Sequence, residues 1–326
     1  MLDHRDQPAA SSASSPPTPV LVLHGIAIRS EERFTRIIAK LNRKLGEHLR
    51  LIPVFWGDLG AQPRHLERLM GRHATRSDHG VDMVADAMRG VVASGVGRVL
   101  SWVQQQRGEA ELAQITRETG TRIRQQSHGR MRGYLNDQFQ SFRLTLTAAM
   151  LPVLTDTIVY QSPVRRAAIH QRVREVLEQQ APGWGTPERP VHVIGHSLGG
   201  VIAFDMAVAQ HQPLHIDHFI TLGSQPALFH LLDPRPGVLP VFEDQPVTLP
   251  RTIGHWTNIW DAFDVLGFSV DQVFRLHDGS PPHETPVKCY FTAIEGAAFF
   301  QSHVGYWART PAVRRMTEAL RDPQTL

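Results

Sequence analysis

A serine lies between two glycines in the segment Gly195-His196-Ser197-Leu198-Gly199. The apolar run before this segment predicts a buried strand, and the residues after Ser197 predict a helix. A Gly-x-Ser-x-Gly spacing at a strand-to-helix junction makes a sharp turn that strains its central residue and needs glycine where strand and helix approach. The segment therefore predicts a nucleophilic Ser197 at the edge of a sheet, with the Leu198 amide and the helix N-terminus placed to stabilise an oxyanion.

This segment, followed by Gly200, resembles the nucleophile turn of the α/β-hydrolase superfamily, specifically its serine esterases and lipases. The resemblance covers the expected sheet and its helices and leaves a long internal segment unmatched. It implies an α/β-hydrolase fold, with a mostly parallel, doubly wound sheet. It also implies a catalytic triad in which an acid and then a histidine follow the serine in the chain, each on a loop after a later strand.

The resemblance implies a catalytic histidine between the last strand and the last helix, and His303 lies there in a Ser-His-x-x-Tyr-Trp setting. A histidine with its ordinary pKa of about 6.5 can accept the serine proton and return it near neutrality. His255 is expected to start a strand, and His277 and His283 precede the last strand. We therefore predict His303 as the base; the alternative is a surface histidine that caps the last helix.

Two aspartates, Asp261 and Asp264, follow an expected strand and could orient that histidine. In the lipases that the chain resembles, the acid is commonly followed by an apolar residue, as in Asp264-Val265. We therefore favour Asp264. Asp261 stays open as the alternative acid, or as a residue that hydrogen-bonds the amides of the turn.

The first expected strand ends in His24-Gly25-Ile26, which resembles the His-Gly turn of lipases. The resemblance implies that the Ile26 amide is the second oxyanion donor beside the Leu198 amide. We expect His24 to fix this loop through hydrogen bonds and not to transfer protons, with Gly25 and the elbow residues Gly195, His196 and Gly199 in supporting roles.

Strand and helix patterns alternate over two parts of the chain, which favours a mostly parallel sheet with helices on both faces. The expected strands are Val20–Leu23, Leu49–Trp56, Val191–Ile194, Phe219–Leu222, His255–Trp260 and Val287–Ile294. The expected helices are Arg29–Arg50, Val164–Gln180, Leu198–Ala209 and Val304–Leu320. The loop Gly223-Ser224-Gln225-Pro226 is expected to line the site or to form a turn there.

Two segments fall outside this alternation. Residues 1–19 form a Ser/Pro-rich tail, predicted to be disordered because it cannot bury enough apolar surface. Residues 59–155 form a helical insertion in the hydrolase domain, residues 20–326. Its arginines at positions 64, 68, 72 and 76 have i, i+4 spacing and would form a ridge on a helix. We slightly favour the interpretation of this ridge as a solvent-exposed helix face over the alternative, a lid or a peripheral contact with an anionic membrane.

The composition narrows the class of protein. With 326 residues, 41% hydrophobic and 20% charged, the chain can bury a large core, and a net charge of +3 does not favour nucleic acid as a partner. One cysteine, no signal-peptide pattern and no uninterrupted apolar run of about 18 residues predict a cytoplasmic protein. Metal-ligand and phosphate-binding motifs are absent from the sequence, so neither a metal nor a nucleotide cofactor is implied.

We therefore expect a serine hydrolase that cleaves a small-molecule or lipid carboxylic ester through an acyl-enzyme, without a cofactor. A thioesterase, acyltransferase or amidase would use the same triad. A non-catalytic, membrane-recruited binding protein on the same scaffold is the alternative from another class. The sequence does not determine the natural substrate, its chain length or the oligomeric state.

Overall fold

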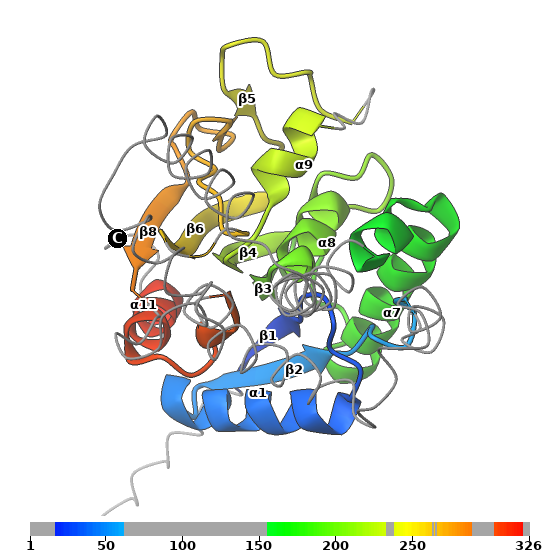
Figure 1. Ribbon diagram of the computed structural model, residues 1–326, viewed down its shortest axis with the longest axis vertical. Coiled ribbons are helices and arrows are strands. Elements are labelled where there is room, and N and C mark those ends of the chain that lie inside the picture. Colours follow the sequence, from blue (N-terminus) through cyan, green and yellow to red (C-terminus); the bar gives the residue numbers. More distant parts are fainter. Residues whose placement is uncertain are drawn as a thin grey trace, which may run out of the picture.

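The computed structural model describes residues 17–61, 155–232, 238–262, 264, 266–288 and 303–321. Its central feature is a six-stranded sheet with the order β2-β1-β3-β4-β6-β8, in which all neighbouring strands are parallel (Figure 1). The strands are β1 (Thr18–Leu23), β2 (Leu49–Val54), β3 (Val191–His196), β4 (Ile216–Leu222), β6 (Ile253–Asp261) and β8 (His283–Val287). Because the strands run the same way, their carboxyl ends share one edge of the sheet.

Helices cover both faces of this sheet. Side chains alternate along a strand, so Val20 and Val22 enter one hydrophobic cluster while Leu21 and Leu23 enter the other. The first cluster includes buried residues of α1 (Glu31–Leu45) and α11 (Thr310–Arg321); the second includes those of α7 (Pro163–Gln180), α8 (Leu198–Ala207) and α9 (Pro226–Leu232). Burial on both faces explains why the central strands are nearly continuous apolar runs. The fold is thus α/β with a parallel central sheet, as expected at that level.

Several element boundaries differ from the sequence expectation. β1 begins at Thr18, inside the expected tail, because Thr18 and Pro19 pair with Leu49 and Arg50 of β2. Most of the expected last strand, Val287–Ile294, lies outside the described residues; the described β8 spans His283–Val287 and pairs with β6 through residues such as His283 and Thr285. A second, two-stranded sheet of β5 (Val247–Thr248) and β7 (Phe274–Arg275) was not expected.

The helices also begin and end differently from the expectation. α1 ends at Leu45, because Gly46 follows with a φ of 114° and donates its N–H to the Asn42 carbonyl. α8 ends at Ala207, and α11 begins only at Thr310. Residues 303–305 form a separate helical turn before α11.

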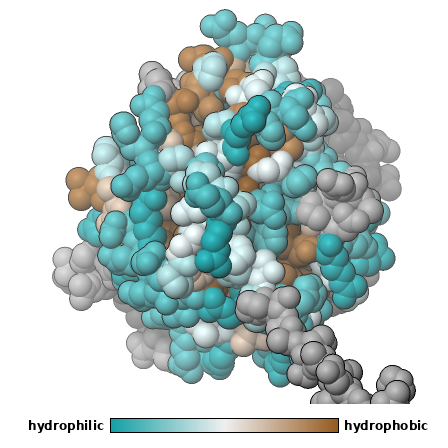
Figure 2. Space-filling model, turned by 180° about the vertical axis from the view of Figure 1, so that it is seen from behind, coloured by the Kyte–Doolittle hydropathy of each residue, from teal (hydrophilic) through white to brown (hydrophobic). Residues whose placement is uncertain are grey.

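Most of the two irregular segments lies outside the described residues. This holds for 1–16 of the expected tail and for 62–154 of the expected insertion, including the arginine ridge. In the part that is described, no helix combines the length and the apolar character needed to cross a membrane. The face opposite to that of Figure 1 is mostly hydrophilic, with separate hydrophobic patches (Figure 2).

The burial of β4 predicts a specific loss of stability. Ile220 is fully buried between β4 and the α1/α11 layer, so Ile220→Ala should lower the free energy of unfolding by about 2–5 kcal/mol through lost burial and a residual cavity. Val164 on α7 is 78% exposed, and Val164→Ala should change it by no more than about 0.5 kcal/mol. Urea denaturation of both variants measures the difference, and equal losses would contradict the layer assignment.

Candidate active site

Ser197 occupies a strained turn between β3 and α8. Its φ of 52° and ψ of −128° lie in a region that non-glycine residues rarely adopt. Glycines make the turn possible: a Cβ on Gly195 would lie 2.5 Å from Gly200 Cα, and a Cβ on Gly199 would lie 2.5 Å from the Leu23 carbonyl oxygen. The predicted strand-turn-helix is therefore present, and its glycines are required by close backbone approach.

Hydrogen bonds hold the backbone of Ser197 in this conformation. Its N–H donates to the Leu222 carbonyl at the end of β4, at 2.9 Å. Its carbonyl accepts from Ser224 Oγ at 2.6 Å and from the Gly200 N–H at 3.0 Å. Ser224 lies in the loop that was expected to line the site. These bonds fasten the turn to the neighbouring strand.

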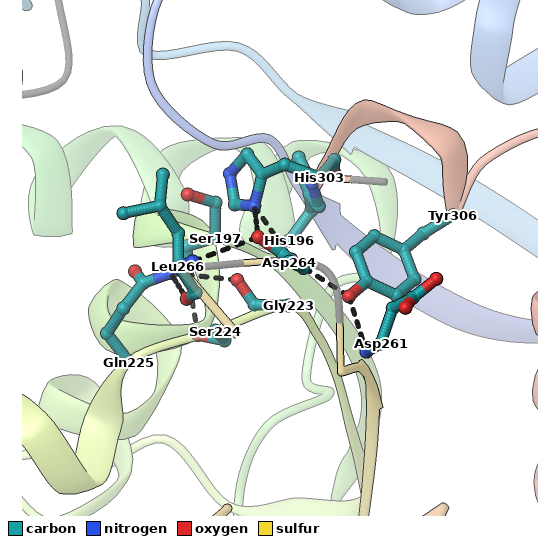
Figure 3. Close-up of polar contacts among 10 residues, drawn as sticks. All are labelled: His196, Ser197, Gly223, Ser224, Gln225, Asp261, Asp264, Leu266, His303 and Tyr306. Carbon is teal, nitrogen blue, oxygen red and sulfur yellow. Dashed lines mark hydrogen bonds and ion pairs between the residues drawn. The ribbon is translucent and has the colours of Figure 1, made fainter. Parts of the chain in front are cut away.

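The structure brings His303 and Asp264 together. His303 Nδ1 lies 2.9 Å from Oδ2 and 3.0 Å from Oδ1 of Asp264, and both side chains are buried (Figure 3). Beside a carboxylate, Nδ1 must carry the proton, which leaves Nε2 as the acceptor. His303 Nε2 is buried and has no hydrogen-bond partner among the described residues. This nitrogen is therefore available to accept a hydrogen bond or a proton from a substrate-side group.

Asp261, the alternative acid, supports Asp264 through its backbone. Its carbonyl accepts from the Asp264 N–H at 2.9 Å, and its own N–H donates to Tyr306 Oη at 3.0 Å. Tyr306 Oη in turn donates to Asp264 Oδ2 at 2.8 Å. The Leu266 N–H donates to Asp264 Oδ1 at 3.0 Å. The carboxylate of Asp264 is thereby fixed toward the His303 ring.

His196, the residue before the serine, holds the backbone of His303. Burial, together with the nearby His303, lowers the pKa of His196 to about 3. The neutral ring therefore donates from Nε2 to the His303 carbonyl, at 2.7 Å. It also packs against the His303 ring, with centroids 4.9 Å apart, and edge-on against Trp307 at 5.3 Å.

His24 fixes the loop that passes over Ser197. The Trp56 N–H donates to His24 Nε2 at 3.1 Å, so Nδ1 carries the proton and donates to the Gly25 carbonyl at 2.6 Å. Burial lowers the pKa of His24 to about 3, and its ring stacks on Trp56 at 4.8 Å. These contacts fit the expected supporting role, because the ring stays neutral near pH 7 and both of its nitrogens are in hydrogen bonds.

Gly25 brings this loop against the nucleophile. A Cβ on Gly25 would lie 2.6 Å from Ser197 Cβ, so only glycine fits there. The next backbone N–H along the loop is that of Ile26. The other is that of Leu198, the first residue of α8, directly after Ser197. Within the described part of the chain, neither amide has a hydrogen-bond acceptor. Both are available to a negatively charged oxygen bound at Ser197.

The side chains of Ser197 and His303 are not hydrogen-bonded to each other, since His303 Nε2 has no partner among the described residues. The close-up shows both side chains at the same site, with Asp264 below the ring (Figure 3). Catalytic hydrogen bonds are often long without substrate and shorten when it binds. The arrangement can therefore pass a proton from a hydroxyl to an imidazole oriented by a carboxylate.

Tyr306 and Ser224 contribute to the site in ways that the sequence did not reveal. The signal for Tyr306 was its place three residues after His303, directly after the helical turn 303–305. Among the described residues, no cluster of three or more His, Cys, Asp or Glu side chains is arranged to hold a metal ion.

The chain matches no protein-family model, and no curated protein matches its sequence.

The neutral buried ring of His24 predicts an acid-dependent stability. In the unfolded chain a histidine gains a proton below about pH 6.5, whereas His24 in the fold stays neutral down to about pH 3. The free energy of unfolding should therefore fall as the pH drops from 6.5 toward 3. In His24→Gln, the free energy of unfolding should change less steeply with pH than in wild type, by up to about 1.4 kcal/mol per pH unit. Urea titrations at several pH values measure it; identical slopes would contradict the neutral assignment.

The bond from Tyr306 to Asp264 predicts a local effect on the histidine. Tyr306→Phe should cost about 1–3 kcal/mol of stability, because it leaves the buried Asp261 N–H without its acceptor. It should also shift the NMR resonance of the His303 Nδ1 proton. Tyr160→Phe is the matched control, since the buried Tyr160 donates instead to Asp205, at 2.6 Å. A His303 resonance that moves equally in both variants would contradict this role.

Proposed function

We propose that the protein is a serine hydrolase that cleaves carboxylic esters, with Ser197 as nucleophile, His303 as base and Asp264 as the acid that orients it. The observation that carries this proposal is the pair of Asp264 contacts to His303 Nδ1, at 2.9 and 3.0 Å, beside a serine with strained backbone. A carboxylate in that position holds the tautomer whose Nε2 accepts the serine proton and stabilises the imidazolium that forms.

The topology supports an α/β-hydrolase fold as part of this proposal. The nucleophile follows β3 and the acid follows β6, at the carboxyl edge of a parallel sheet. The base lies on the helical turn before α11 and contacts the acid there. Ligands of open parallel sheets bind at that edge. The chain order of serine, acid and histidine is that of the superfamily the sequence resembles.

The proposed reaction proceeds through an acyl-enzyme. Ser197 Oγ attacks the ester carbonyl carbon while its proton passes to His303 Nε2, and the carbonyl electron pair moves to oxygen. The amides of Ile26 and Leu198 stabilise this oxyanion, each by about 3–4 kcal/mol. The tetrahedral intermediate then loses the alkoxide, which takes the proton from His303.

Water completes the turnover by the same route in reverse order. His303 Nε2 takes a proton from water as the water oxygen attacks the acyl carbon, and the second tetrahedral intermediate releases Ser197, which regains a proton from His303. The carboxylic acid leaves. The same chemistry acts on thioesters and amides, and a second alcohol in place of water gives acyl transfer, so substrate trials decide among these.

The decisive test is labelling with a fluorophosphonate probe, followed by hydrolysis of p-nitrophenyl esters of increasing chain length. Wild-type protein should label, Ser197→Ala should not label at all, and His303→Ala should label far more slowly. Asp264→Asn should lower kcat by about 10⁴-fold, because the amide favours the wrong histidine tautomer.

Asp261→Asn is the matched control, because Asp261 lies three residues away, is equally buried, and contributes its backbone to the site. It should keep most of the wild-type kcat. Loss of turnover in Asp261→Asn alone would show that the acid is assigned wrongly. Folded wild-type protein that neither labels nor hydrolyses any ester, with or without lipid vesicles, would favour the non-catalytic binding scaffold.

A further inference from the structure

A carboxylate outside the triad is fully buried next to the loop that carries Ile26. Asp156 Oδ2 accepts from the Ala27 N–H at 2.9 Å, and Oδ1 accepts from the Ala61 N–H at 2.8 Å. Arg29 Nη2 donates to Oδ1 at 2.6 Å, in an ion pair with 22% of the arginine side chain and none of the aspartate exposed. Both carboxylate oxygens are thus occupied by donors from two other segments.

These contacts join parts of the chain that are far apart in sequence. Asp156 lies in the helical residues 155–161, more than 90 residues after Ala61 and 129 residues after Ala27. Arg29 Nε also donates to the Ala61 carbonyl at 3.1 Å. A Cβ on Gly60 would lie 2.7 Å from Asp156 Oδ1, so this neighbourhood is tightly packed. The loop after β1, the loop after β2 and residue 156 therefore form one hydrogen-bonded unit.

The loop held in this way is under backbone strain. Ala27 has a φ of 60°, a left-handed conformation that costs energy for any residue with a side chain. Its N–H is the atom that Asp156 binds, so the hydrogen bond fixes the peptide between Ile26 and Ala27. On its other side the loop is fixed by His24 and by the contact of Gly25 with Ser197. Ile26 lies between these two anchors.

We propose that Asp156, charge-balanced by Arg29, is a positioning residue that holds the Ile26 amide in place to stabilise the oxyanion at Ser197. This inference rests on the proposed function. A preorganised donor needs no rearrangement when charge develops on the substrate, which is the main source of its effect. An Asn at 156 has only one acceptor oxygen and would turn an amide N–H toward one of the present donors, so it cannot hold all three.

The test compares Asp156→Asn and Arg29→Lys with wild type and with Glu318→Gln. Arg29→Lys keeps the positive charge but replaces the guanidinium, which donates from two nitrogens to Asp156 and to the Ala61 carbonyl, with a single ammonium group. Glu318 is the control because it forms a partly exposed ion pair with Arg315, at 2.8 Å, and both residues lie on α11. Three quantities are measured: fluorophosphonate sites per folded protein, kcat per titrated site together with KM, and hydrogen exchange of peptides covering residues 24–29.

Asp156→Asn should still label to completion. Its kcat per site should fall about 100-fold, which is the loss expected when the Ile26 amide is displaced by about 1 Å, and its KM should stay within about twofold of wild type. Exchange in residues 24–29 should become faster. In Arg29→Lys, kcat per site should fall about tenfold and exchange in residues 24–29 should also become faster. Glu318→Gln should show neither change. This pattern separates positioning from a purely structural role, which would lower the number of labelled sites and leave kcat per site unchanged.

Unchanged exchange at residues 24–29, or unchanged kcat per site, in both Asp156→Asn and Arg29→Lys would overturn the inference. In that case an active wild type leaves the proposed function standing. A wild-type protein that neither labels nor turns over overturns the proposed function itself, and the inference with it. The two failures are therefore distinguished by the wild-type result alone.

Discussion

The strained backbone at Ser197 is the constraint on which the rest of the site depends. A φ of 52° at a residue with a side chain persists only where the surroundings determine it more than once. Here the ends of β1 and β4, the start of α8 and the Ser224 hydroxyl all contact the turn. Removing space at Gly25 or Gly199 would force these elements apart. The sheet order that places β3 between β1 and β4 is therefore what makes the turn possible.

Neutral histidines and buried carboxylates both hold the loops around this turn through hydrogen bonds. His24 and His196 are kept neutral by burial, and each uses a ring N–H to bind a backbone carbonyl, that of Gly25 and that of His303. A neutral ring can be buried at less cost than a charged one, provided that its nitrogens find partners. These two side chains fix the backbone, whereas His303 keeps an Nε2 that has no hydrogen-bond partner among the described residues.

Two buried carboxylates position two different groups around Ser197 in the proposed mechanism. Asp264, fixed by Tyr306 and the Leu266 amide, orients the base. Asp156, fixed by Arg29 and two amides, orients the loop with the oxyanion donor. Each accepts a hydrogen bond from a distant part of the chain, Asp264 from Tyr306 and Asp156 from Ala27, and a buried charge requires such partners. Proton transfer and oxyanion stabilisation would then both depend on preorganised buried charge, so that neither needs water to rearrange during the reaction.

The sequence by itself determined the alternation of strands and helices and the turn at Ser197. Both are local: apolar runs mark strands buried on two faces, and the glycine spacing marks a close backbone approach. The tertiary structure alone decided which carboxylate meets His303, because Asp261 and Asp264 have nearly the same local sequence context and only the turn between them directs one side chain to the ring. It also decided that β8 pairs through His283–Val287 and that Asp156 reaches Ala27. Such contacts join loops that are distant in the chain, and their geometry follows from how the sheet and helices pack, which no short segment of sequence encodes.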